Sequence, residues 1–419
     1  MSEAFERLGI CCPHILLPRR GIPWEKWAVV ACDQYTSQPE YWQAVERMVG
    51  DAPSTLRLML PEAYLGTPEE DGRQAAVATA MQDYLARGVL EDEGPCMVLV
   101  RRQVSSGVRT GFVTAIDLEA YDFAPDSRSL IRATERTITD RLPPRVRIRQ
   151  QAALEMPHVM LLMDDADNRV LGSLQPATED APLYDFDLMC GGGHITGWRI
   201  PERCYPDMQR ALAGLLCGEH PILFAVGDGN HSLATAKVCW EGLKPILSPE
   251  TRACHPARYA LVEVVNLHDP ALTFHPIHRA VFGQPAGQTL TELRQELERA
   301  DCRTAADDRL QHTVGCLVDG RRLPLGFERA DAGLPLTLLQ PALEALVARR
   351  PELKVDYIHG QDVLQRLAQQ PDCLGLSLPP LDKAALFPEV NRNGPLQLKT
   401  FSMGEAQEKR YYLECRGIQ

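Results

Sequence analysis

The hydrophobic and polar positions of the N-terminal part predict short buried strands between amphipathic helices. Short apolar runs predict strands at 27–32, 55–60 and 158–163. Two further runs on either side of Ser105-Ser106-Gly107 predict a hairpin of 96–103 and 109–118. Apolar residues at helical spacing predict helices at 39–49, where Pro39 suits the first turn, and at 69–85, which Gly88 follows.

The same alternation continues along the chain. Strands are predicted at 183–188, 194–200, 221–226 and 258–267, helices at 202–217, 231–241 and 290–300, and a hairpin at 312–327. The pattern of the sequence changes near the segment Phe282-Gly283-Gln284-Pro285. We therefore predict a main domain at 1–285 and an inserted or small subdomain at 286–352. A C-terminal segment, 353–419, is expected to return to the main domain.

The composition is that of an ordinary folded protein, with 45% apolar and 24% charged residues in 419. A net charge of −12 argues against a nucleic-acid partner, which requires a basic face. The 13 cysteines include no CxxC pair, so neither disulfides nor a zinc site is expected. The N-terminus lacks the apolar core of a signal peptide, and no uncharged run reaches the ~18 residues of a membrane helix. We expect a mixed α/β (α+β) protein of the cytoplasm, with no membrane partner and no zinc, haem or flavin.

The strongest candidate for chemistry is the turn Gly227-Asp228-Gly229-Asn230-His231-Ser232, between a predicted strand and a predicted helix. Its glycines let main-chain N–H groups converge, and the positive end of the following helix attracts an anion. Asp228 could hold magnesium or a substrate hydroxyl, and His231 could donate a proton or a hydrogen bond. The alternative is that Asp228 and Asn230 only form a tight turn and cap the helix. The spacing is not that of a Walker motif.

A second candidate is the segment 132–149, where six arginines fall within 18 residues of an acidic protein. Guanidinium groups bind phosphate or carboxylate oxygens bidentately, so the cluster suits an anionic ligand. Glu135 is surrounded by cations, would stay ionised, and could act as a general base toward a hydroxyl. The alternative is a solvated basic face whose arginines pair with surface carboxylates.

Three weaker motifs have structural explanations as well. His275-Pro276-Ile277-His278-Arg279 could bring two imidazoles together, or could serve the fold alone. Gly191-Gly192-Gly193-His194 could be an anion-binding nest or only a turn. The tail 399–412 mixes cations, hydroxyls and aromatic rings, and could equally be a surface strand. No Ser-His-Asp order can be assigned, because the sequence has no GxSxG elbow.

Four ordered motifs together resemble one uncharacterised bacterial family, domain of unknown function family 1015. They are the 227–232 turn, the Arg132-Ala133-Thr134-Glu135 block with its continuation to Arg145, the 275–279 motif and the 399–412 tail. The resemblance covers most of the chain and implies a remote relation to the ParB/sulfiredoxin superfamily. In that superfamily a DGHHR-like turn binds phosphates, and one branch is a free-serine kinase that uses ADP. The implied fold is a ParB/sulfiredoxin-like core with added strands, an inserted subdomain and a C-terminal segment that packs back on the core.

The resemblance also implies roles for single residues. Asp228, Asn230 and His231 match the phosphate-gripping turn, where Asn230 replaces the usual histidine and Ser232 the usual arginine. We expect the arginines of 132–149 to supply the missing positive charge. Glu135 matches the glutamate that activates serine. The expected catalytic residues are Glu135, Asp228 and His231, and the expected phosphate or substrate ligands are Arg132, Thr134, Thr137, Arg141, Arg145, Gly227, Gly229, Asn230, Ser232, His278, Arg279, Lys399 and Ser402.

The leading hypothesis is phosphoryl transfer on a small hydroxylated amino acid, serine or phosphoserine, with ADP or ATP as co-substrate. Magnesium would accompany the nucleotide, with Asp228 as its ligand. Members of the family are often encoded beside serine-biosynthesis enzymes, which favours the same substrate. The alternatives are a phosphoserine phosphatase, in which water replaces the nucleotide, and a non-catalytic nucleotide-binding regulatory protein. A homodimer is the assembly that we consider.

Overall fold

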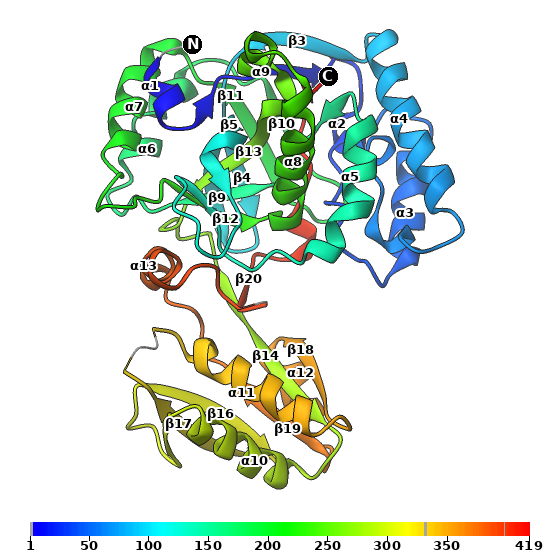
Figure 1. The fold of residues 1–419 in the computed structure, drawn as a ribbon. Helices are drawn as coiled ribbons and strands as arrows, with labels where there is room; N and C mark the ends of the chain where they lie inside the picture. Colours follow the sequence, from blue (N-terminus) through cyan, green and yellow to red (C-terminus); the bar gives the residue numbers. More distant parts are fainter. Residues whose placement is uncertain (1–2, 331–332, 398) are drawn as a thin grey trace. The chain divides into compact units, whose positions relative to one another are not determined.

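The computed structural model describes residues 3–330, 333–397 and 399–419 and divides the chain into two compact units (Figure 1). Unit 1 consists of residues 1–273 and 404–419, and unit 2 of residues 274–403. Unit 2 is therefore larger than the segment 286–352 that the sequence suggested. The change of pattern near 282–285 marks the end of strand β14 (Phe274–Phe282), which pairs inside unit 2, rather than a boundary between units.

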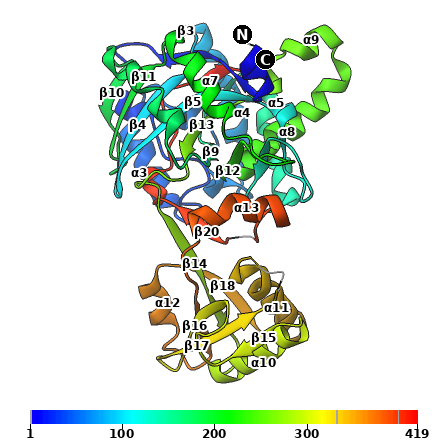
Figure 2. The ribbon, with the colours of Figure 1, turned by 90° about the vertical axis from the view of Figure 1, so that its left-hand side faces the viewer.

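Unit 1 is built around a ten-stranded mixed sheet, flanked by helices (Figures 1 and 2). Its order is β10-β11-β4-β5-β13-β9-β12-β7-β6, with β1 paired to β5. The strands are β1 (Ile10–Cys11), β4 (Val98–Val104), β5 (Gly107–Asp117), β6 (Tyr121–Asp122), β7 (Ile131–Ala133), β9 (Met160–Met163), β10 (Tyr184–Asp187), β11 (His194–Arg199), β12 (Phe224–Asp228) and β13 (Tyr259–Asn266). Two small ladders accompany the sheet: β2 (His14–Pro18) with β3 (Leu90–Pro95), and β8 (Leu154–Glu155) with β21 (Arg416–Gly417).

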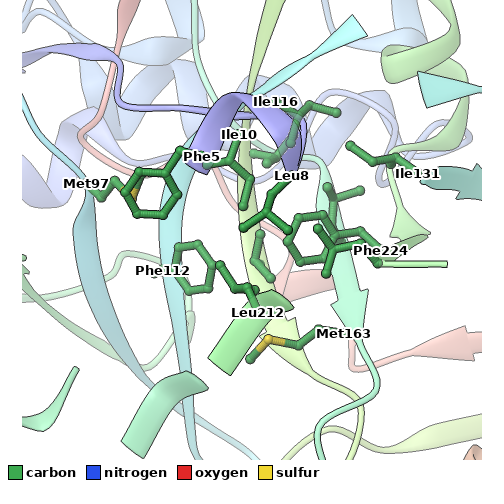
Figure 3. Packing of buried hydrophobic residues seen from close by; sticks show 14 of the residues in the cluster. Phe5, Leu8, Ile10, Met97, Phe112, Ile116, Ile131, Met163, Leu212 and Phe224 are labelled. Atoms are coloured by element: carbon green, nitrogen blue, oxygen red, sulfur yellow. The ribbon is translucent and has the colours of Figure 1, made fainter. Parts of the chain in front are cut away.

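Both faces of this sheet are covered, which explains why central strands such as β9 and β13 are nearly continuous apolar runs. Successive side chains of a strand point to opposite faces. In β4, Leu99 accordingly belongs to one apolar cluster, and Val98 and Val100 to another. Figure 3 shows the first cluster, in which side chains of the strands meet Phe5 and Leu212 of the covering helices.

The helices of unit 1 agree largely with the helical spacing of the sequence. They are α1 (Glu3–Arg7), α2 (Trp24–Trp27), α3 (Pro39–Val49), α4 (Glu70–Ala86), α5 (Leu142–Gln151), α6 (Arg169–Gly172), α7 (Tyr205–Ala213), α8 (Asn230–Leu243) and α9 (Pro249–Cys254). Helix α3 has the predicted bounds and α4 nearly so. Helices α5 and α8 lie side by side, which brings the arginine-rich segment next to the glycine turn (Figure 1).

The apolar run 27–32 is not the strand that the sequence predicts. Helix α2 occupies 24–27, and beyond it the backbone is irregular and pairs with the C-terminal segment. The Ala31 N–H donates to the Lys409 carbonyl at 2.8 Å, and the Tyr411 N–H donates to the Val29 carbonyl at 3.1 Å. The run is apolar because it is buried on all sides, and burial alone does not distinguish a strand from such a segment.

The prediction of a strand at 55–60 is also wrong. Residues Thr55–Arg57 form a 3₁₀ turn, and the Ser54 hydroxyl accepts a hydrogen bond from the Leu56 N–H at 3.2 Å. Serine competes for backbone groups in this way and favours a capped turn over a strand.

Unit 2 combines a second sheet with four helices among its described residues. The sheet order is β15-β17-β16-β19-β14-β18, and β20 pairs with β14. Besides β14, the strands are β15 (Arg303–Ala305), β16 (His312–Val318), β17 (Arg321–Glu328), β18 (Lys354–His359), β19 (Cys373–Ser377) and β20 (Phe401–Met403). The helices are α10 (Ala286–Arg299), α11 (Pro335–Arg349), α12 (Gln361–Leu367) and α13 (Lys383–Asn393). The predicted hairpin at 312–327 is confirmed as β16–β17.

Two expectations about the chain as a whole can be compared with the structure. All 13 cysteines are free thiols, as their spacing suggested. Of the helices in the described ranges, none combines the length and the apolar character needed to cross a bilayer.

The loop between β10 and β11 offers a test of the packing in unit 1. Gly193 (φ 79°) and Gly191 (φ 68°) both have left-handed backbones, but a Cβ on Gly193 would lie 1.9 Å from the Gln103 carbonyl oxygen, whereas one on Gly191 meets nothing within 4 Å. Both changes to alanine incur the left-handed cost of about 1 kcal/mol. Gly193→Ala should lower the free energy of unfolding by a further ~2 kcal/mol, because β4 must shift.

Urea unfolding followed by tryptophan fluorescence measures this difference, because all five tryptophans lie in unit 1. Gly191→Ala is the matched control. Equal losses for the two variants would contradict the close approach of Gly193 to β4.

Candidate active site

The predicted strand–turn–helix is present at the end of β12. The strand ends at Asp228, Gly229 turns the chain with a left-handed φ of 76°, and α8 begins at Asn230. A Cβ on Gly229 would lie only 3.0 Å from the Cα of Val159, so glycine is required here by space as well as by backbone angle. One oxygen of Asp228, Oδ1, accepts the Gly229 N–H at 3.0 Å.

The two distant segments of the sequence hypothesis meet at this turn. Strand β7 runs parallel to β12, and directly after it the Thr134 hydroxyl donates to the Val226 carbonyl at 2.5 Å. The Asn230 amide donates to the Glu135 carbonyl at 3.0 Å and to the Thr137 hydroxyl oxygen at 3.1 Å. The turn and the start of the arginine-rich segment therefore form one hydrogen-bonded structure.

His231 faces the same segment in its neutral form. Burial and the charges of Arg145 and Arg141 lower the pKa of His231 to about 4. Its Nε2 accepts the Ile138 N–H at 3.3 Å, which assigns the ring proton to Nδ1. At neutral pH this histidine can donate a hydrogen bond from Nδ1, and it is not an imidazolium acid.

The arginines of 132–149 have different environments. Arg132 is buried and donates to the backbone carbonyls of Ser129 and His220, so it holds the local loop together. Arg145 forms an ion pair with Glu62, and Arg149 pairs with Glu155 at 2.6 Å. The alternative of arginines paired with carboxylates thus describes much of the cluster.

Arg141 differs from these arginines. It is exposed at the start of α5, and its charge acts on His231. Within the described ranges it makes no ion pair. Arg136 is also exposed and makes no ion pair within the described ranges. Arg136 and Arg141 are therefore the arginines of this segment that can still receive an anion, and of these two only Arg141 acts on His231.

Three charged or titratable residues at the turn were not named as site residues from the sequence, although one of them, Lys409, belongs to the 399–412 motif. Lys409, from the C-terminal segment, lies with its Nζ 3.1 Å from Oδ2 of Asp228. His158 lies just before β9, and its Nε2 is 2.7 Å from the Ser232 hydroxyl oxygen. The third is Asp33, which follows the irregular run 27–32 and interacts with both His158 and Lys409. A polar residue directly after a buried apolar run was the available signal for Asp33.

Two of these residues, Asp33 and Lys409, stabilise each other in their charged forms. Burial favours the protonated carboxyl of Asp33, but the charge of His158, a hydrogen bond from Gln34 and the charge of Lys409 outweigh it and lower its pKa. Burial likewise disfavours the ammonium of Lys409, but Asp228 and Asp33 raise its pKa. The site thus keeps the Lys409 ammonium and the Asp33 carboxylate ionised at neutral pH.

The remaining predicted ligands belong to unit 2. His278 accepts the Leu378 N–H at Nδ1, 3.1 Å away. Arg279 is buried; its Nε donates to the Gln340 amide oxygen at 3.1 Å, and its guanidinium lies over the ring of Tyr357. The Lys399 ammonium lies 4.8 Å from the centre of the same ring, and half-buried Ser402 pairs with β14. These contacts are internal to unit 2, and a role of the four residues in phosphate binding stays a prediction.

Metal ligands are sparse in the parts of the chain that the structure describes. No group of three or more His, Cys, Asp or Glu side chains gathers there to hold a metal ion. Asp228 already contacts Lys409 and the Gly229 N–H. Magnesium is usually held by one or two carboxylates together with substrate phosphates, so a single carboxylate fits a site that the substrate completes.

A cavity elsewhere in unit 1 fits a phosphate less well. It has a volume of about 1080 Å³, and its lining includes Cys11, Cys12 and Tyr205. The two arginines of its lining already donate hydrogen bonds to carboxylates: Arg258 to Asp117, and Arg416 to Glu155. The turn at 227–232 therefore remains the better candidate.

Comparison with known proteins identifies the family. A family model described as "Protein of unknown function (DUF1015)" matches residues 16–346. The chain belongs to this family. No curated protein matches the DUF1015 chain.

Several solved structures are similar to this DUF1015 protein at a low level. A free serine kinase in complex with AMP has 10% identity and a TM-score of 0.38, over 73% of this chain and 91% of that one. SbnI with a C-terminal truncation from Staphylococcus aureus has 12% identity and a TM-score of 0.38, over 70% and 82%. A conserved hypothetical protein from Pyrococcus furiosus has 10% identity and a TM-score of 0.35, over 73% and 95%. Similarity at this level is too low to locate an active site or a substrate.

The low pKa of His231 predicts a pH dependence of stability. Its folded-state value of about 4 lies below the ~6.5 of an unfolded histidine, so the unfolded chain binds more protons between these values. Stability should therefore fall as the pH decreases from about 6.5 to about 4. Because the ring is only partly buried, we expect a loss of about 1–2 kcal/mol.

Urea unfolding of unit 1 at pH 7, 5.5 and 4.5 measures this loss. His231→Gln should remove it, whereas His14→Gln, at an exposed histidine, should keep it. If the free energy of unfolding of His231→Gln falls with decreasing pH as steeply as that of the wild-type protein, another group is responsible for the pH dependence.

Proposed function

We propose that this protein is a phosphotransferase that moves a phosphoryl group between a nucleotide and a small hydroxylated amino acid. Serine and phosphoserine are the first substrates to test. One observation carries the proposal: the glycine turn, the segment after β7 and the C-terminal Lys409 come together around a helix N-terminus. Cations and ionised carboxylates gather there, as phosphoryl transfer requires.

The phosphate would bind at the start of α8. The first N–H groups of a helix have no acceptor within the helix, and the helix dipole favours an anion at that end. The ammonium group of Lys409 and the guanidinium group of Arg141 add positive charge from two other segments. This charge replaces the arginine that the related DGHHR-like turn carries where Ser232 stands.

The acceptor group would be held by carboxylates. Asp33 is ionised at neutral pH, and it can accept hydrogen bonds from the hydroxyl or ammonium group of an amino acid. Glu135 is the proposed general base toward the hydroxyl, and its backbone is fixed by the Asn230 amide. Neutral His231 would donate a hydrogen bond to the substrate from Nδ1.

A nucleotide would bring magnesium to the site. Asp228 is the proposed protein ligand, and the nucleotide phosphates would complete the coordination. The metal would supply charge neutralisation on the transferred group. Lys409 would remain on the other side of the Asp228 carboxylate and hold it in place.

Phosphorus NMR tests the proposal directly. The protein with magnesium and phosphoserine is mixed with ADP, AMP or no nucleotide, and we expect phosphate to move to a nucleotide. Asp228→Asn should lower kcat/KM by about 10²-fold or more, because the site loses a preorganised charge. Asp126→Asn, at an exposed carboxylate of unit 1, is the control and should keep wild-type activity.

Each other outcome of this experiment favours an alternative. Free phosphate without any nucleotide indicates a phosphoserine phosphatase. Nucleotide binding without turnover in any mixture indicates a regulatory protein and overturns the phosphotransferase.

A further inference from the structure

Ser232 has the surroundings of an activated nucleophile. It lies in the first turn of α8, and its hydroxyl oxygen is 2.7 Å from Nε2 of His158. The contact joins residues 74 positions apart, so it is set by the fold and not by local sequence. Both side chains are half-buried.

The other side of the imidazole is organised as well. The ring of His158 packs edge-on against Tyr411, with ring centres 5.0 Å apart. Its Nδ1 is buried and has no hydrogen-bond partner within the described ranges. Asp33 also interacts electrostatically with this histidine.

We propose that Ser232 is a covalent nucleophile toward phosphorus and that His158 is its general base. The nucleophilicity of Ser232 stands independently of the proposed function, whereas its use in phosphoryl transfer rests on that function. The first N–H groups of α8 lie at the same turn, where they can stabilise negative charge on the phosphorus oxygens. This arrangement is a nucleophile hydrogen-bonded to a base.

The step balances without a further reactant. The Ser232 oxygen forms a bond to the phosphorus of the donor, and its proton passes to Nε2 of His158. The bond between phosphorus and the leaving oxygen breaks, and its electron pair stays on that oxygen. In the second step the acceptor hydroxyl attacks the phosphorus on Ser232 and gives its proton to Glu135, which releases it to solvent. The bond from phosphorus to the Ser232 oxygen breaks, and Ser232 regains its proton from His158.

A fluorophosphonate probe tests the nucleophile without knowledge of the substrate. The serine oxygen displaces fluoride from phosphorus, and peptide mass spectrometry locates the label. We expect a label on Ser232 in the wild-type protein, none there in Ser232→Ala, and a rate about 10²-fold lower in His158→Gln, because general-base assistance is lost. Ser173→Ala is the matched control, since this half-buried serine donates only to the Val170 carbonyl.

Several results would overturn the proposal: no label on the wild-type protein, a label at another residue only, or an unchanged rate in His158→Gln. Thermal unfolding followed by tryptophan fluorescence shows whether each variant is folded. If Ser232→Ala does not fold, the labelling rate of His158→Gln tests the proposal. Acid-quenched reactions with phosphoserine extend the test. Phosphoryl transfer that persists in folded Ser232→Ala overturns the covalent step and leaves the proposed function standing, whereas probe labelling without any transfer supports the nucleophile and removes the proposed function.

Discussion

The candidate site depends on the ammonium group of Lys409. Burial favours the protonated form of Asp33, and the neighbouring His158, a hydrogen bond from Gln34 and the charge of Lys409 together lower its pKa. Lys409 contacts Asp228 directly, and its charge also acts on Asp33. It comes from the last segment of the chain, so the site is complete only after the C-terminus has packed on the sheet.

The sequence was informative wherever function depends on local geometry. The strand–turn–helix at 227–232 could be predicted from local features. A glycine allows the left-handed backbone of a turn, and the helix that follows a buried strand presents its N-terminus there. Its meeting with the segment after β7 was also expected. Asp33 and His158 were not selected, because a single polar residue at the end of an apolar run is a weak signal that gains significance only from neighbours far away in the sequence.

The arginine-rich segment shows where composition misleads. Arginines are attracted to any carboxylate, and an acidic protein offers many partners of its own. Glu62 and Glu155 bind two of the arginines, and backbone carbonyls bind Arg132. Arg136 and Arg141 are left for an anion, and only the positions of the carboxylates in the folded chain could distinguish them from the others.

The course of the chain at the two ends of unit 2 has a consequence for protein engineering. The first residues of β14 pair with β20, and the Gly404 N–H donates to the Thr273 carbonyl at 3.3 Å. The chain therefore leaves unit 1 and re-enters it at adjacent points, as in a domain inserted into a surface turn. Closing so small a gap costs little loop entropy. Residues 274–403 can thus be regarded as an inserted domain. Its deletion would leave every strand of the ten-stranded sheet in the remaining chain.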